Sequence, residues 1–350
     1  MSEPPTLLDM PNVALGVILD HCVHISIQSL RKTCHDLRNR INEIKPDPKI
    51  KSITIKISHE FIRLMYESDE MVSRSGGTSH VIYKPHKEGF SVYSSRCIVW
   101  KIVRGMDYIE AFCNDLDFAM ANMKRELNWF CIESFSELLY IIKSTEQRNA
   151  LEENVEKVFA HLSNKLSQRK TPMLTSQLIV EITNQNQFMR ILPYFKLSGL
   201  KRITVVDTEG IFKNCEMEEF MKSDQWKQAE SLTITGYFES LPEIRKFSHL
   251  SRFEFGIKSF TAETYLKLKD MLLEPSALEF LSIHSEHKQL DIFEVLENTV
   301  RFGENTTRAY FKTRDGTRLL SIDESPYTNN QFIASFSKFD KSVHADSIIN

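Results

Sequence analysis

The fold follows from the stretch LKRITV (Leu200–Val205), whose pattern of apolar and variable positions, apolar-x-x-apolar-x-apolar, returns along the chain. Strong copies begin at Leu127, Ala229, Leu250 and Leu278, and a weaker copy lies between residues 177 and 182. The copies from residue 200 onward start 29, 21 and 28 residues apart. A short apolar run of this kind predicts a buried strand, and its return at similar intervals predicts repeated structural units.

Helical stretches separate these predicted strands, at residues 216–221, 242–247, 262–273 and 292–298. Strand, helix and strand in that order predict a parallel sheet with right-handed crossovers. One unit cannot bury its own apolar face, so the copies are expected to stack. The interval is close to the roughly 20–29 residues of leucine-rich repeats, but the copies in this sequence lack the asparagine that regular leucine-rich repeats carry at a fixed position. We therefore expect an α/β fold whose main part is a degenerate, leucine-rich-repeat-like solenoid.

The residues before the repeats predict a less regular, strand-rich start. Isoleucines alternate from Ile53 to Ile57, which predicts a strand. Residues 67–98 predict a β-meander or a hairpin, with a turn at Ser75–Thr78 and short strands at 81–83 and 90–93, and residues 108–125 predict a helix. One face of that helix carries Phe112, Leu116, Ala119 and Met123.

The C-terminal residues predict further strands or a mobile end. Asp315-Gly316 predicts a hairpin turn. Phenylalanines at 332, 336 and 339 interleave with serine, asparagine and aspartate in the residues that follow. We expect residues 316–350 to form either a final strand pair or a loosely docked tail.

Composition narrows the class of protein. Of the 350 residues, 44 are basic and 47 acidic, which leaves a net charge of −3 and no field that favours direct nucleic-acid binding. The first residues lack the basic and apolar regions of a signal peptide, and the longest apolar runs are far shorter than a membrane span. The six cysteines are scattered without a CxxC pair. These features predict an intracellular protein, cytoplasmic or nuclear, with reduced thiols and no membrane.

The N-terminal residues predict short amphipathic helices that end before Pro46 and Pro48. The apolar positions of the first run are Leu15, Ile18, Leu19 and Cys22, and those of the second are Ile27, Leu30, Cys34, Leu37 and Ile41. A unit of about forty residues rarely buries enough surface to fold alone. It is therefore either a helical cap on the domain that follows or a docking module for a partner.

Both parts of the chain resemble a known family. The pattern Leu8-x-Met10-Pro11 with the two apolar runs resembles an F-box, in which Met10-Pro11 replaces the usual Leu-Pro pair. The string Leu30–Asn39 with Lys45-Pro46-Asp47 is similar to nematode-expanded F-box proteins that carry a C-terminal FTH domain. Signatures that resemble the FTH domain are Ile191-Leu192-Pro193 with Leu200–Ile203, Gln225–Ile234, and His249-Leu250.

With this resemblance the chain divides into an F-box at 1–48, an FTH domain at 49–315 and the C-terminal residues 316–350. The resemblance implies docking on the Skp adaptor subunit of a cullin-RING (SCF) ubiquitin ligase, and recruitment of a target protein by the FTH domain. The residues that it implies for adaptor binding are Leu8, Pro11, Leu15, Ile18, Leu19, Leu30 and Leu37. The target and its binding residues stay unknown. The alternative is an interaction scaffold outside ubiquitination, which bridges for example an RNA-binding protein.

No motif predicts catalysis, a metal or a cofactor. The sequence contains no GxSxG, HExxH or P-loop pattern. His284, Glu286, His287 and Asp291 form the only local group of possible ligands, and we interpret them as a solvated loop. Trp226 precedes a predicted buried strand, which favours core packing over a role as a surface anchor.

Overall fold

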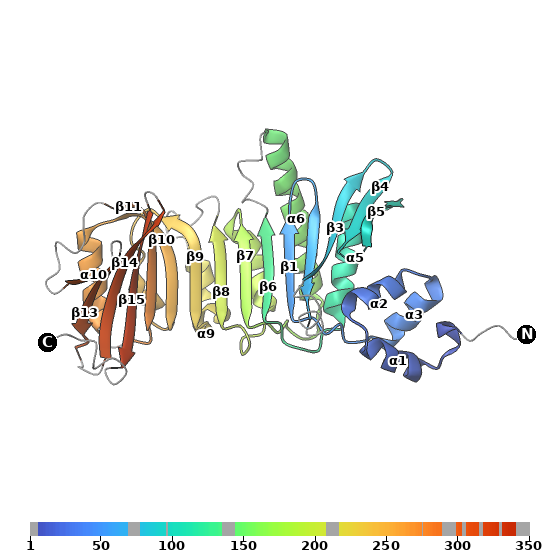
Figure 1. Cartoon of the computed structure of the whole chain (residues 1–350), viewed down its shortest axis with the longest axis horizontal. Helices are drawn as coiled ribbons and strands as arrows, with labels where there is room; N and C mark the ends of the chain where they lie inside the picture. Colours follow the sequence, from blue (N-terminus) through green and yellow to red (C-terminus); the bar gives the residue numbers. More distant parts are fainter. Residues whose placement is uncertain are drawn as a thin grey trace, which may run out of the picture. The chain divides into compact units, whose positions relative to one another are not determined.

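The structure is a computed structural model in which residues 6–68, 78–95, 97–134, 144–207, 217–274, 276–288, 299–302, 306–314, 318–328 and 331–340 are described. It forms two compact units, whose helices and strands are labelled in Figure 1. Unit 1 comprises Met1–Ile179 and Arg190–Gly199, and unit 2 comprises Val180–Met189 and Leu200–Asn350. The boundary in the sequence passes through strand β7 (Gln177–Ile182) and helix α7 (Gln185–Ile191), and α7 is followed by the 3-10 turn Leu192–Tyr194.

Unit 1 begins with a helical module. It consists of the 3-10 turn η1 (Leu7–Asp9) and the helices α1 (Asn12–Asp20), α2 (His24–Arg31) and α3 (His35–Ile44). Helix α3 starts where the Leu37 amide donates a 3.4 Å hydrogen bond to Cys34 Sγ. It ends at Lys45, whose φ of 53° is left-handed and turns the chain out of the helix. Pro46 follows, so the predicted helical segment and its proline boundary are confirmed.

The sheet of unit 1 combines one parallel pair with an antiparallel meander. Its strands are β1 (Ser52–Ile57), β2 (Ile62–Glu67), β3 (Ser79–His86), β4 (Gly89–Ser94), β5 (Cys97–Arg104) and β6 (Trp129–Ser134), in the order β6-β1-β2-β3-β4-β5. β1 pairs parallel with β6 and antiparallel with β2. Of the two alternatives for residues 67–98, the structure forms the meander, in which β3 and β4 contain the predicted strands 81–83 and 90–93 and turn at Lys87-Glu88. Residues 75–77 of the predicted turn lie outside the described residues.

Helices α5 (Tyr108–Ala121) and α6 (Thr145–Ser167) pack against each other and against this sheet. The Asp107 carboxylate starts α5, because it accepts a 2.8 Å hydrogen bond from the Ile109 amide. Phe112, Leu116 and Ala119 are buried, as the helical spacing predicts. Helix α5 ends four residues earlier than predicted, so Met123 lies beyond the helix and not on this face.

The strands of unit 2 match the repeated motif. β8 (Arg202–Asp207), β9 (Ser231–Phe238), β10 (Arg252–Phe260) and β11 (Phe280–Lys288) pair in parallel. The second apolar position of the motif is buried in all four strands, and its residues lie side by side across the sheet: Ile203, Leu232, Phe253 and Leu281. The predicted parallel strands are therefore confirmed, with equivalent motif positions in register.

The predicted helical stretches between these strands differ in length. Helices α8 (Glu218–Lys222) and α9 (Asp224–Gln228) follow β8, whereas only the 3-10 turn η5 (Ile244–Phe247) follows β9. Helix α10 (Ala262–Leu273) has the predicted bounds. The predicted stretch 292–298 lies outside the described residues.

Trp226 lies in the core of unit 2. Its side chain is 4% exposed, and its ring lies 5.0 Å from that of Phe220, 5.2 Å from that of Phe247 and 4.9 Å from that of His249. His249 Nε2 also lies 3.0 Å from the Trp226 carbonyl oxygen. The prediction of core packing for Trp226 is confirmed.

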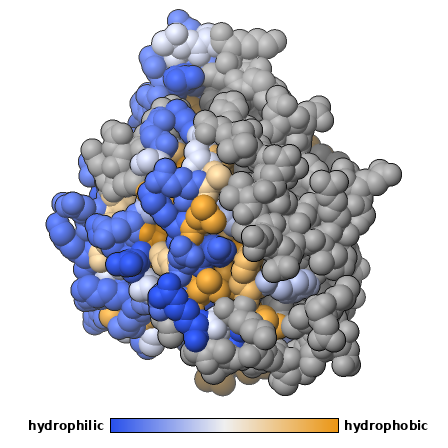
Figure 2. Space-filling model, turned by 90° about the vertical axis from the view of Figure 1, so that its left-hand side faces the viewer, coloured by the Kyte–Doolittle hydropathy of each residue, from blue (hydrophilic) through white to orange (hydrophobic). Residues whose placement is uncertain are grey.

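Beyond β11 the parallel order ends. β12 (Thr299–Phe302), β13 (Thr306–Lys312), β14 (Arg318–Thr328) and β15 (Gln331–Asp340) are antiparallel to their neighbours, in the order β12-β13-β14-β15-β11. Of the two alternatives for the C-terminal residues, the structure forms the strand pair. Asp315-Gly316 lies outside the described residues. Figure 2 faces the C-terminal end of unit 2, where apolar side chains are visible among hydrophilic ones.

Candidate functional site

The helical module has a small core of its own that also includes one residue of helix α5. The buried members of this core are Leu15, Leu19, Ile27, Leu37, Ile41 and Phe118. Phe118 belongs to α5, so the module completes its core with a side chain from the domain that follows. Of the residues predicted to bind a partner, Leu15, Leu19 and Leu37 are at most 4% exposed.

The same module exposes apolar side chains on its outer side. We call Leu8, Val13, Val17 and Ile18 the α1 surface; their exposed fractions are 40%, 82%, 57% and 36%. Val13 and Val17 are four residues apart in helix α1 and therefore lie on one side of it, away from the buried Leu15 and Leu19. Large apolar side chains with this exposure are typical of surfaces that a partner covers.

The structure separates the predicted binding residues into two groups. Leu8, Pro11 and Ile18 lie at the surface and Leu30 is half-buried, whereas Leu15, Leu19 and Leu37 lie in the module core. Leu15, Leu19 and Leu37 thus contribute to the module's own core. Val13 and Val17 are not among the residues predicted from the sequence, because regular helical spacing selects the face that packs inward. Apolar residues that fall off this spacing are the signal that would have found them.

Arg40 fixes the segment that carries this surface. From helix α3 its guanidinium donates hydrogen bonds to the carbonyl oxygens of Leu8, at 2.7 Å, and of Met10. It also donates to Asn12 Oδ1, at 2.8 and 3.0 Å, in the first turn of α1. A planar guanidinium that binds several oxygens holds them in one geometry, so Arg40 positions the start of α1 and the preceding turn.

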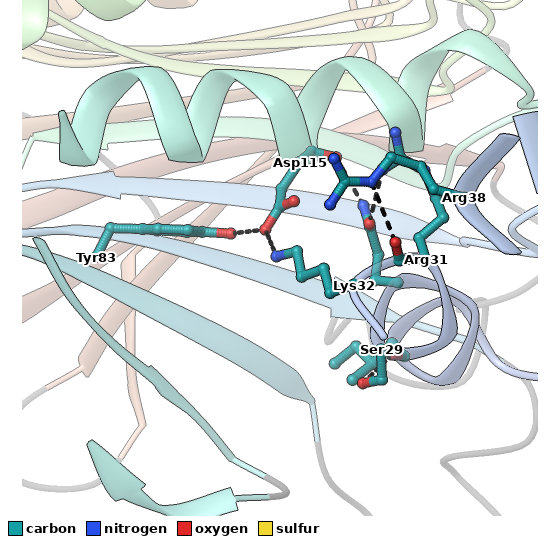
Figure 3. Close-up of polar contacts among 8 residues, drawn as sticks. Ser29, Arg31, Lys32, Arg38, Tyr83 and Asp115 are labelled. Atoms are coloured by element: carbon teal, nitrogen blue, oxygen red, sulfur yellow. Dashed lines mark hydrogen bonds and ion pairs between the residues drawn. The ribbon is translucent and has the colours of Figure 1, made fainter. Parts of the chain in front are cut away.

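A polar anchor joins helix α2 to helix α5 and the sheet (Figure 3). Lys32 Nζ lies 2.6 Å from Asp115 Oδ2, and the Tyr83 hydroxyl donates a 2.5 Å hydrogen bond to the same oxygen. Gln28 Nε2 donates to the Asp115 carbonyl oxygen at 3.2 Å. Burial, followed by the negative charge of Asp115, raises the pKa of Tyr83 well above its ordinary value. Tyr83 therefore keeps its proton and remains a donor to Asp115.

Arg31 adds a contact beside this anchor. Its guanidinium carbon lies 4.0 Å from the centre of the Phe118 ring, a distance at which a cation attracts the face of an aromatic ring. Phe118 thus contributes its ring to the module core and also contacts a cation of α2. The module is consequently fixed to the rest of unit 1 by both apolar and charged contacts.

We expect Asp115→Ala to destabilise unit 1 by about 1–3 kcal/mol, because it leaves the buried Tyr83 hydroxyl without its acceptor. Lys32 is 51% exposed and can return to water at little cost. Urea unfolding measures the loss. Tyr83→Phe removes the stranded hydroxyl, so Asp115→Ala should cost less in that background. Equal costs in both backgrounds would contradict the role given to this hydrogen bond.

A pocket of about 180 Å³ lies next to the anchor. Its lining comes from α2, α5 and the strands β2–β5: His24, Ile25, Gln28, Ser29, Lys32, Tyr66, Val81, Tyr83, Val92, Ser94, Val99, Lys101 and Asp115. His24 is 2% exposed, and neither of its ring nitrogens has a hydrogen-bond partner among the described residues. Desolvation, with smaller contributions from Lys32 and Arg31, lowers the pKa of His24 to about 3. His24 is therefore neutral at physiological pH.

Unit 2 has a larger hollow, of about 870 Å³, between η5 and helix α10. Apolar and charged side chains line it together, among them Leu241, Ile244, Met271, Arg245 and Glu274. Such a mixed lining resembles the polar and apolar composition of protein interaction surfaces.

The described part of the chain holds no cluster of three or more histidine, cysteine, aspartate or glutamate residues with metal-binding geometry. His284 and its neighbours 285–288 belong to strand β11, so our interpretation of a loop at 284–287 was wrong; Asp291 lies outside the described residues. Among the described residues, Cys22, Cys34, Cys113 and Cys131 form no disulfide. Among the described helices none is long and apolar enough to cross a bilayer.

Comparison with protein families gives two matches. Residues 7–49 match the model of the F-box domain, and residues 156–298 match that of the FTH domain. The first match covers the helical module with its α1 surface, and the second covers helix α6 from residue 156 onward and the strands β7–β11. No curated protein and no solved structure matches the chain.

Proposed function

Because the chain belongs to the family of proteins that join an F-box domain to an FTH domain, we propose that it is a substrate-recruiting adaptor of an SCF ubiquitin ligase. F-box proteins are generally non-catalytic adaptors, and we propose no chemistry for any residue of this chain. The observation that carries the proposal is the exposed α1 surface within the matched F-box domain.

The docking partner in this proposal is the Skp adaptor subunit of the ligase. Leu8, Val13, Val17 and Ile18 contact it directly, together with Pro11. Leu15, Leu19 and Leu37 act from beneath, because they keep α1 and α3 in place. Half-buried Leu30 packs against the module core and leaves part of its side chain for the partner.

The target protein is bound by the rest of the chain in this proposal. The in-register parallel strands β8–β11 support the description of this part as a leucine-rich-repeat-like solenoid. The ligase then acts by proximity: a target held on the same chain as the Skp adaptor has a raised effective concentration near the charged conjugating enzyme. Neither step requires a catalytic residue in this chain.

We expect Val17→Asp to lower capture of the Skp adaptor by at least about tenfold, because docking would desolvate a carboxylate without a partner. Val17 is 57% exposed, so the substitution leaves the module folded. The matched control is Val99→Asp, at a valine that is 69% exposed and lies outside the module. Co-purification of the full chain with the adaptor measures the effect. Unchanged capture by Val17→Asp, with normal thermal unfolding, would contradict docking through the α1 surface.

The alternative function is an interaction scaffold outside ubiquitination, in which the module is only a cap. The packing of Phe118 into the module core and the Lys32–Asp115 ion pair favour this alternative. The two functions differ in one result. A scaffold predicts that the wild-type chain does not capture the Skp adaptor, whereas the adaptor proposal requires that it does.

A further inference from the structure

Strand β5 lies at the edge of the unit 1 sheet. It pairs with β4 on one side, and within the described residues no strand pairs with its other side. An edge strand offers unpaired amide and carbonyl groups to any extended chain. Natural proteins usually protect such an edge with charges, prolines or a cover.

Strand β5 and the turn after it are instead rich in exposed apolar side chains. Val99, Trp100, Ile102, Val103 and Met106 are 69%, 43%, 55%, 37% and 36% exposed. In the described part of the chain, the α1 surface holds the remaining large apolar residues with such exposure. An apolar edge of this length is expected to be covered by another polypeptide segment.

The backbone of β5 is oriented for such an addition. The Gly105 amide donates to the Glu88 carbonyl oxygen at 3.3 Å, next to the pair Gly89 and Arg104. Amides alternate in direction along an antiparallel strand, so those of Ile102 and Arg104 point away from β4. These amides are donors for an added strand.

The charges around β5 select an acidic segment. Lys101 lies in the middle of the strand and, with Val99, forms one wall of the 180 Å³ pocket. Lys32 and Asp115 lie in the same pocket, so two ammonium groups face one carboxylate there. Lys84, on strand β3, adds a further positive charge, because its Nζ lies 5.5 Å from the centre of the Trp100 ring of β5.

We propose that β5 binds an extended segment of the recruited target protein, which adds to the sheet as a further strand and places a carboxylate opposite Lys101. Apolar side chains of this segment cover Val99 and Val103 on one face and Trp100 and Ile102 on the other. The proposal rests on the proposed recruiting function and names the chemistry of the recruited partner.

A second copy of this chain is a less suitable occupant of the edge. Two copies of β5 could pair antiparallel about a two-fold axis at Lys101. Val99 of one copy would then lie opposite Val103 of the other, and Trp100 opposite Ile102, so that all four exposed apolar residues of the strand are paired. This register places two ammonium groups directly opposite each other, which destabilises a strand pair. Charge therefore favours an acidic partner strand over self-association.

The test uses the full chain and two acetylated, amidated peptides that alternate valine and threonine over about eight residues, enough to span a strand. One peptide has a central glutamate and the other a central lysine. Fluorescence anisotropy of labelled peptides should show about fivefold tighter binding of the glutamate peptide, from one favourable cross-strand charge pair. Lys101→Glu should reverse this preference. Amide hydrogen exchange should show protection of Ile102 on binding.

Equal binding of the two peptides, or a preference that Lys101→Glu leaves unchanged, would overturn the proposal. Concentration-dependent dimerisation in sedimentation, abolished by Ile102→Asp, would assign the edge to a second copy and would also overturn it. Adaptor capture is measured on the same variants. Val17→Asp should keep peptide binding and Lys101→Glu should keep adaptor capture, so a failure of one proposal is distinguishable from a failure of the other.

Discussion

Leu19→Ala is expected to lower the free energy of unfolding of the helical module by about 2–5 kcal/mol, the usual range for truncating a fully buried leucine. Leu19 is 0% exposed and lies among Leu15, Ile27 and Phe118 in the module core. Val17→Ala is the matched control. Val17 is 57% exposed on the same helix, and its truncation should change stability by no more than about 0.5 kcal/mol.

Amide hydrogen exchange of helices α1–α3 under increasing urea measures both variants. Because the core supports the α1 surface, Leu19→Ala should also weaken adaptor capture. The loss should equal the fraction of molecules whose helical module is unfolded, since the folded molecules keep the α1 surface. Lower temperature should therefore restore capture by Leu19→Ala and should not restore capture by Val17→Asp. A Leu19→Ala protein with unchanged exchange rates would show that the module is not held together by this core.

Acidification is expected to destabilise unit 1 through His24. The pKa of His24 falls from 6.5 to about 3 on folding, mainly because burial removes its ring from water. Between these two values the unfolded chain binds a proton that the folded chain does not, so stability is complete above 6.5 and decreases as the pH falls. The loss is about 1.4 kcal/mol for each pH unit in this window.

His24→Phe should flatten the pH dependence of stability between about 6.5 and 3. A phenyl ring suits the site, because His24 contacts the ring of Tyr66 at 4.6 Å and that of Phe118 at 6.0 Å. The control is His35→Gln, in a side chain that is 80% exposed. Urea unfolding at a series of pH values gives the slopes. A wild-type slope that persists in His24→Phe would assign the acid sensitivity to other groups.

Much of the fold could be predicted from the sequence because apolar spacing reports burial directly. The motif at Leu200–Val205 and its copies predicted the parallel strands of unit 2. Of the antiparallel strands β12–β15, only the final pair β14–β15 was among the expectations, since pairing partners are set by tertiary contacts rather than by local patterns. Short connections such as η5 likewise carry too few residues for a helical period to appear in them.

The candidate site was only partly predictable for a related reason. Helical spacing identified Leu15 and Leu19 but could not show that they face the module's own core. Val13 and Val17 lie off that spacing, and only the structure shows that these apolar side chains are exposed. The anchor of Lys32 and Tyr83 on Asp115 joins residues that are far apart in the sequence, so no local pattern contains it.

The position of Phe118 has a consequence for synthesis of the chain on the ribosome. The first helices emerge from the ribosome long before Phe118 is added. Strand β1 likewise cannot pair with β6 until β6 has been synthesised, because Ser52 lies opposite Trp129 in that pair. The nascent N-terminal segment is therefore without its last core side chain until well over a hundred residues have been translated. During that interval chaperones can bind its exposed apolar surfaces. A fragment that ends at residue 49 would lack Phe118 permanently, and its core would stay incomplete.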